Sequence, residues 1–119
     1  MPNISTFFEK IFGQRSPPAM KEISPGLFLI REESEDGSSI AYHLDVAKNK
    51  RIHFEIDFRG STNLHLSSGG LSTMCIVNPY EKREVARLFC KQPNKGWKIK
   101  VQFKWEGKYT TIFKLILYH

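Results

Sequence analysis

Cysteine is the most reactive residue type in this chain, but the surroundings of both cysteines favour a structural role. Cys75 lies in the apolar run Met74–Ile76, and Cys90 follows Phe89. A nucleophilic thiol needs a positioned base, usually a histidine, and no motif of that kind surrounds either cysteine. Two cysteines in 119 residues also form no disulfide framework. We therefore expect two reduced, buried thiols in an intracellular protein without enzymatic activity.

Histidines and carboxylates in the segment 38–58 form a second group with potential metal chemistry. Apolar residues alternate there with polar ones on either side of a turn at Lys48–Lys50. If the two halves pair as a hairpin, its solvent face pairs Asp45 with His53 and His43 with Glu55. Opposite charges across two strands stabilise a sheet by tenths of a kcal/mol up to about 1 kcal/mol. We interpret the group as cross-strand pairs, with a metal site as the alternative.

A cluster of acids precedes Gly37 and has the chemistry that calcium prefers. Carboxylate oxygens are hard ligands for this cation, and some β-sandwich proteins bind it in their loops. The spacing is not that of an EF-hand, and an Asp-Gly pair is typical of a tight hairpin turn. We favour a solvated turn and keep calcium as the alternative. The candidate ligands are Glu32, Glu33, Glu35 and Asp36.

The net charge of +6 is concentrated at the carboxyl end of the chain. From Lys91 onwards there are seven lysines and one acid, Glu106, so this segment carries all six units of the excess. Such asymmetry is typical of a surface for an acidic protein, anionic lipid or nucleic acid, although lysines also protect sheet edges from aggregation. The candidate contact residues are Lys98, Lys100 and Lys104 in one row, and Lys82, Arg83 and Arg87 in a second segment.

The elements that carry these side chains are predicted to be short strands. Ile52–Phe58 alternates apolar and polar residues with a period of two, as a strand with one buried face does. Gly60-Ser61 and Gly69-Gly70 interrupt the pattern, and Asn78-Pro79 ends a further apolar segment, Ser72–Val77. Hydrophobic residues at 40% and charged residues at 25% suit one globular domain. The pattern predicts an all-β fold, an antiparallel β-sandwich of about eight strands.

The carboxyl end is predicted to be a hairpin. Apolar residues alternate with lysines and Gln102 over 97–105, and a second alternating segment begins at Tyr109. Only a three-residue turn at 106–108 directs both apolar rows to the core. That register pairs Trp105 with Tyr109 and Val101 with Phe113. The lysine row then lies on an outer face without interleaved aromatic residues for base stacking, which weighs against nucleic acid.

Residues 1–20 are predicted to be a short amphipathic helix with a Pro-rich linker, ahead of a β-sandwich domain at 21–119. Thr6 and Glu9 have the spacing of a capping box, and Gly13 ends the helix. One helical face collects Phe7, Phe8, Ile11 and Phe12. A helix of two turns is unstable alone, so we expect this face to pack on the sandwich. Binding of a partner is the alternative.

The amino-terminal sequence lacks the features of a signal peptide, namely a basic region followed by a long apolar run. No segment reaches the apolar length that a transmembrane segment needs. We therefore expect a cytoplasmic, soluble protein without cofactors.

The central third of the chain resembles a known family. The residues that carry the likeness are Ile52–Phe58, Ser61–Ser67, Gly70, Val77–Pro79 and Arg83–Val85. This arrangement resembles the non-catalytic C-terminal β-sandwich domain of calpain-type proteases, most closely the small optic lobes homology type. The paired prolines of that family appear here as Asn78-Pro79, and the cysteines beside its acidic residue appear as Ile56 and Phe58.

The resemblance implies an accessory module. In that family the Cys-His-Asn catalysis belongs to a separate papain-like core, so no catalytic residue is carried over. Such domains act as scaffolds, as interaction modules or, in the C2-like domain III type, as sensors of acidic lipid and calcium. We expect a non-catalytic interaction or scaffolding module with a protein partner. The alternatives are C2-like peripheral binding to anionic phospholipid, assisted by calcium, and nucleic-acid binding through the lysine-rich strand.

Overall fold

The structure is a computed structural model that describes residues 19–105, 108–109 and 113–115. All of its elements are strands: β1 (Ala19–Ser24), β2 (Leu27–Glu33), β3 (Ser39–Val46), β4 (Ile52–Asp57), β5 (Leu64–Leu66), β6 (Ser72–Val77), β7 (Lys82–Cys90), β8 (Ile99–Trp105), β9 (Lys108–Tyr109) and β10 (Phe113–Leu115). The predicted helix with Phe7, Phe8, Ile11 and Phe12 lies outside the described residues.

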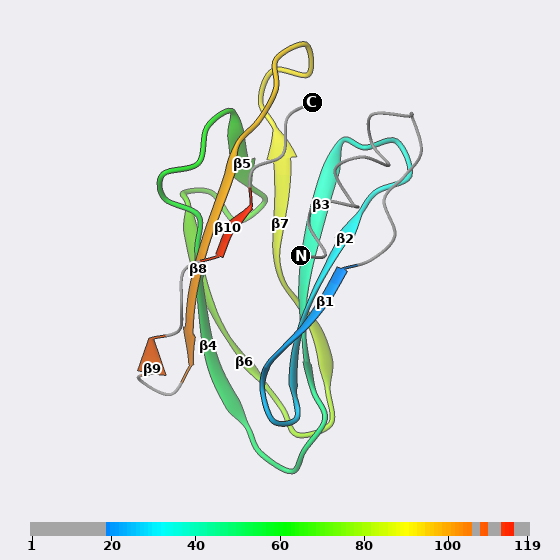
Figure 1. Ribbon diagram of the computed structural model, residues 1–119, viewed down its shortest axis with the longest axis vertical. Helices are drawn as coiled ribbons and strands as arrows, with labels where there is room; N and C mark the ends of the chain where they lie inside the picture. Colours follow the sequence, from blue (N-terminus) through cyan, green and yellow to red (C-terminus); the bar gives the residue numbers. More distant parts are fainter. Residues whose placement is uncertain (1–18, 106–107, 110–112, 116–119) are drawn as a thin grey trace.

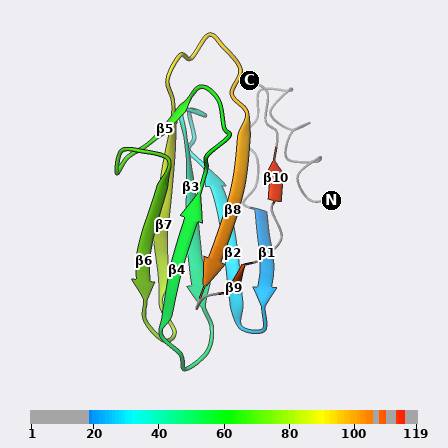
Figure 2. The same ribbon diagram turned by 90° about the vertical axis from the view of Figure 1, so that its left-hand side faces the viewer.

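Two antiparallel sheets pack face to face in a sandwich-like arrangement (Figures 1 and 2). The first sheet has the order β1-β2-β3-β7-β5 and the second β10-β8-β4-β6, with β9 paired to β8. Figure 2 looks onto the second sheet, with β6 at its left-hand margin. The predicted all-β, antiparallel class is therefore confirmed.

The core forms where the inward residues of both sheets meet, and it follows the predicted alternation. Ile52, Phe54 and Ile56 of β4 are almost completely buried. They share one cluster with Trp97, which precedes β8, and with apolar residues of β2, β3, β7 and β8, among them Phe103. Burying each such side chain contributes about 1.5–3 kcal/mol to folding, so this cluster fixes which face of each strand points outwards.

The expected hairpin between β3 and β4 does not form. β3 pairs with β2 and β7, whereas β4 pairs with β6 and β8 in the other sheet. The register therefore places His43 opposite Ile30 and Glu84, and His53 opposite Ile76. The predicted charge pairs of His43 with Glu55 and of Asp45 with His53 are wrong. Val46 ends β3 in the first sheet and Ile52 begins β4 in the second, so the connection between them crosses from one sheet to the other.

The carboxyl-terminal hairpin agrees with the prediction in one of its two registers. Val101 pairs with Phe113 as expected, but Trp105 pairs with Lys108 and not with Tyr109. The registers of β8 with β9 and of β8 with β10 therefore differ by one residue.

Candidate interaction site

β6 is an edge strand with unpaired backbone groups. It pairs with β4, and none of the other strands in the described part of the chain pairs with its second edge. The Phe58 amide donates to the Leu71 carbonyl at 2.7 Å. Because such bonds alternate along an antiparallel pair, the backbone groups of Thr73 and Cys75 point to β4. The N–H and C=O groups of the outward set, Ser72, Met74 and Ile76, face away from the sheet.

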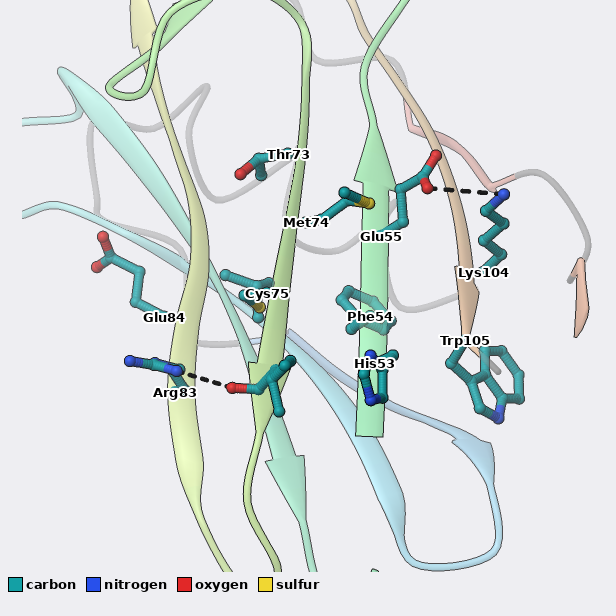
Figure 3. Close-up of a pocket in the computed structure, with 12 residues that line it drawn as sticks. His53, Phe54, Glu55, Thr73, Met74, Cys75, Arg83, Glu84, Lys104 and Trp105 are labelled. Atoms are coloured by element: carbon teal, nitrogen blue, oxygen red, sulfur yellow. Dashed lines mark hydrogen bonds and ion pairs between the residues drawn. The ribbon is translucent and has the colours of Figure 1, made fainter. Parts of the chain in front are cut away.

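β7 is also an edge over its first half. β5 pairs only with Leu88–Cys90, so Lys82–Ala86 has no neighbour on that side among the described strands. This half of β7 lies beside β6 at the open margin between the two sheets. A groove of about 850 Å³ extends along β6 there (Figure 3). Its lining residues are His53, Phe54, Glu55, Thr73, Met74, Cys75, Ile76, Arg83, Glu84, Val85, Lys104 and Trp105.

The surface of the groove is largely apolar. Met74 is 74% exposed and Ile76 is 40% exposed, on the outer side of β6. Thr73 and Cys75 are half-buried on its inner side, and Val85 of β7 is buried. Desolvation raises the pKa of the Cys75 thiol, partly offset by the charge of Arg83. The thiol is therefore protonated and a poor nucleophile at neutral pH.

Most charges of the groove are already neutralised. Lys104 lies 3.6 Å from Glu55, and Glu84 accepts a 2.7 Å bond from Arg87. Arg83 differs, because its Nη1 donates to the carbonyl of Ile76 at 2.7 Å and no ion pair joins it to the carboxylates that line the groove. Figure 3 shows this side chain extending from β7 across to β6.

The structure divides the second basic segment between two surfaces. Arg83 is the register partner of Leu44, whose side chain is in the core. The Arg83 side chain therefore leaves the backbone on the inner side of β7. Lys82 and Arg87 lie on the outer side of the same strand, opposite Asp45 and Ala41. The three residues therefore do not form one basic patch.

Lys100 and Lys104 of the predicted lysine row lie on the outer side of β8, and Lys98 directly precedes this strand. Lys104 is paired to Glu55, while Lys98 is exposed and Lys100 is half-buried. The register places Lys114 of β10 opposite Lys100. Lys104 lines the groove, whereas Lys98 and Lys100 do not.

The acidic turn does not gather its carboxylates. Glu33 is opposite Ile40 and Glu32 opposite Ala41, so they point to opposite faces of β2. Asp36 instead accepts bonds from Ser34 Oγ at 2.8 Å, Ser38 Oγ at 2.7 Å and the Ser38 amide at 3.0 Å. These bonds, led by Ser38, lower the pKa of Asp36 to about 2. Across the described residues, no group of three carboxylate, histidine or cysteine side chains has the arrangement to hold a metal ion.

Asn63, a residue of the family-like motif, organises the loop 91–96. Its backbone is left-handed, with φ of 64°. Its side-chain oxygen accepts from the Gln92 amide at 2.9 Å, and its Nδ2 lies 3.0–3.1 Å from three carbonyl oxygens. The carbonyls belong to Gln92, Lys95 and Gly96. Sequence reasoning missed this role, although asparagine is the residue that most readily combines a left-handed backbone with local hydrogen bonds.

A buried polar pair was also missed by sequence reasoning. Arg31 is 7% exposed and is the register partner of Tyr42, which is 3% exposed. Burial raises the pKa of the Tyr42 hydroxyl to about 12, while the charge of Arg31 acts in the opposite direction. Arg31 follows Leu27 and Leu29 at two-residue intervals, so the strand period alone placed it inside.

A comparison of the sequence with protein-family models finds no match, and neither does a comparison with curated proteins. In the described residues, no helix has the length and hydropathy needed to cross a membrane.

Proposed function

We propose that this chain is a non-catalytic interaction module that binds an extended segment of a protein partner by strand addition along β6. The free edge of β6, with exposed Met74 and Ile76 beside it, is the observation that carries the proposal. In strand addition the backbone ladder supplies affinity, and alternate side-chain contacts supply specificity. The likeness to accessory β-sandwich domains of calpain-type proteases supports the same assignment.

Two other sheet margins, those of β1 and β5, support the proposal because each carries a feature that discourages pairing. β1 presents Lys21 and Glu22 and has a register shift before Ser24. β5 has only three residues. Short strands, charges and bulges are the usual ways to protect an edge. β6 has six residues, STMCIV, without charge or proline, and its register with β4 is unbroken.

The energetics of the edge suit a reversible partner. A segment beside β6 gains hydrogen bonds with Ser72, Met74 and the Ile76 amide, each worth about 0.5–1.5 kcal/mol. Contact with the exposed apolar atoms of Met74 and Ile76 adds to this at about 25 cal/mol per Å². Ordering of the incoming segment offsets part of both gains.

A non-catalytic role is supported by the chemistry of the groove. The raised pKa of Cys75 opposes its use as a nucleophile. The carboxylates Glu55 and Glu84 are engaged by Lys104 and Arg87. The half-buried thiols Cys75 and Cys90 suit the reducing cytoplasm, where we place the module.

The experiment that tests this function is a titration of the ¹⁵N-labelled full chain with a peptide of alternating valine and threonine. The amides of Ser72, Met74 and Ile76 should shift in a saturable manner, and N-methylation of the peptide should abolish the shifts. Met74→Lys should weaken binding about tenfold or more, since it places a charge in the new ladder.

The matched control is Met20→Lys, which makes the same change at a methionine that is 60% exposed on β1. It should leave binding unchanged. Shifts that map elsewhere, or that survive N-methylation, would rule out strand addition at β6.

A second candidate function is binding of an anionic surface at the lysine row. Exposed Lys98, half-buried Lys100 and the register of Lys114 with Lys100 favour it. Co-sedimentation with anionic liposomes at low and physiological salt, with and without calcium, tests it. Salt-sensitive binding without calcium would support the lysine row, and calcium-dependent binding would support a C2-like role of the acidic turn. Nucleic acid would instead show a steep salt dependence with little sequence preference.

A further inference from the structure

Arg83 gives the β6 groove a charge that is not balanced within its own lining. The neighbouring acids Glu55 and Glu84 are held by Lys104 and Arg87. The guanidinium of Arg83 instead bonds a neutral carbonyl, that of Ile76, at 2.7 Å. An arginine bonds a carboxylate more strongly than a carbonyl, because charge assists the bond and two N–H groups can act together. The groove therefore favours an acidic group at this position.

The position of Arg83 also defines one end of the edge. Ile76 is the last residue of β6 whose backbone points outwards, because Val77 is paired to Ile52. By holding the Ile76 carbonyl, Arg83 occupies the carboxyl end of the free edge and leaves the Ser72 and Met74 groups open. An added strand thus begins its ladder at Arg83 and runs towards Ser72.

The direction of the added strand follows from the rest of the fold. Every strand pair in the described residues is antiparallel, including β4 with β6. Antiparallel ladders are slightly more stable per residue than parallel ones. In that direction the amino end of the added strand lies at Ile76, beside Arg83.

We infer that the groove binds an extended acidic segment, an antiparallel strand with a carboxylate side chain at its amino end against Arg83. This inference rests on the proposed strand addition. The residues behind the carboxylate alternate between the exposed side, next to Met74, and the inner side, next to Thr73 and Cys75. The inner positions suit small apolar side chains because Val85 of β7 faces them across the groove.

The net charge of the chain acts in the same direction. At +6 it attracts acidic partners and raises their rate of encounter at low salt. This long-range attraction does not select an orientation, whereas a single guanidinium at one end of the ladder does. The two contributions are separable by moving the carboxylate along the ligand.

The test uses three alternating valine and threonine peptides of about six residues. They carry glutamate at the amino end, glutamate at the carboxyl end, or lysine at the amino end. Dissociation constants come from the amide shifts of Ser72, Met74 and Ile76 in the ¹⁵N-labelled full chain. We expect the amino-terminal glutamate to bind about fivefold more tightly than the other two peptides, with the advantage reduced at high salt.

Two variants of Arg83 assign the preference to its side chain. Arg83→Gln should equalise the three peptides, and Arg83→Glu should reverse the preference in favour of lysine. Lys82→Glu is the matched control, since it makes the same change of charge one residue away on the opposite side of β7. It should weaken both glutamate peptides equally. Thermal unfolding of each variant checks that the fold is retained.

The two levels of the proposal fail in different ways. If all three peptides shift the β6 amides with equal affinity, strand addition stands and the acidic preference at Arg83 is wrong. If the carboxyl-terminal glutamate binds best, the strand is parallel and the antiparallel assignment is wrong. If no peptide shifts these amides at millimolar concentration, the proposed function itself fails.

Discussion

β1 and β6 are both six-residue edge strands with one prominently exposed methionine, yet their margins differ. Met20 of β1 is 60% exposed beside Lys21 and Glu22, and the strand has a register shift before Ser24. Met74 of β6 is 74% exposed in a strand without charge and without irregularity. An exposed methionine alone therefore does not mark a binding edge. The residues beside it decide whether another strand can pair there.

Charged residues next to β6 limit non-specific pairing of its free edge with other strands. Arg83 covers the Ile76 carbonyl, and the first half of β7, with Lys82, Arg83 and Glu84, lies beside it. Charges that flank an apolar strand limit aggregation without removing its free backbone groups. The edge of β1 therefore discourages pairing, whereas the edge of β6 keeps free backbone groups beside flanking charges.

The largest effect on stability is expected at Phe54, a core residue of β4 that pairs with β6. Phe54 of β4 is opposite Cys75, is 2% exposed and stacks on Phe103 with ring centres 5.9 Å apart. Phe54→Ala should lower the free energy of unfolding by about 3–5 kcal/mol, because a cavity replaces the ring. Urea denaturation measures this. Met74→Ala is the control and should change stability by less than about 0.5 kcal/mol.

The second prediction removes the protection of β1. Lys21→Val with Glu22→Val should make this edge resemble β6 and promote self-association, with dimers forming at roughly tenfold lower concentration. Sedimentation velocity of the full chain measures the association. The reciprocal change, Ser72→Lys with Met74→Lys, should reduce any self-association. If the β1 variant stays as monomeric as the original chain, charge does not distinguish the two edges.

A pH dependence of stability is expected from His43 on the outer face of the first sheet. Desolvation lowers the pKa of His43, and the positive charge of Lys82 lowers it further. The carboxylates of Glu84 and Glu32 act in the opposite direction, but the pKa remains lowered. The unfolded chain therefore binds more protons than the folded chain below about pH 6.5. Stability should fall as the pH decreases through that value, and His43→Gln should flatten the decrease. Urea denaturation at several pH values checks both statements, and parallel curves for the two proteins would contradict them.

The smallest effect is expected at the start of β6. Asp57, opposite Ser72, accepts a 2.8 Å bond from Arg59 Nε, and this bond lowers the pKa of Asp57. The Arg59 side chain is 76% exposed, so solvent screens this ion pair and Arg59→Ala should lower stability only slightly at neutral pH. Because the pKa of Asp57 is below its unfolded value, the contribution is lost as the pH falls through its folded pKa. Chemical denaturation at neutral and acidic pH measures the difference.

The sequence predicted the strands well because their alternation is local. Ile52–Phe58 was read from the period of two, and Ser72–Val77 was read from an apolar run that Asn78-Pro79 ends. The strands β4 and β6 form at these places. Alternation shows which side chains enter a core, but not which sheet a strand joins. For that reason Val46 and Ile52 were expected in one hairpin, although they lie in different sheets.

The candidate site was harder to predict because an edge is a non-local property. β6 is an edge only because the register puts β8 and β4 on one side of it and no described strand on the other. The bond from Arg83 to Ile76 joins residues of different sheets, and neither residue type signals it. The lysine row, by contrast, was predicted on one outer face of β8, but its pairing with Glu55 was not.

The Asn63 amide makes the two exposed loops near β5 very different in their tolerance of insertions. In the loop after β5, the space around Gly69 and Gly70 is open, since an added Cβ would meet no atom within 4 Å beyond the adjacent residues. In the loop 91–96, three carbonyls converge on Nδ2 of Asn63. An added residue there separates them and breaks several bonds at once. A tag or label inserted after β5 therefore preserves the domain, whereas one inserted at 91–96 disrupts it.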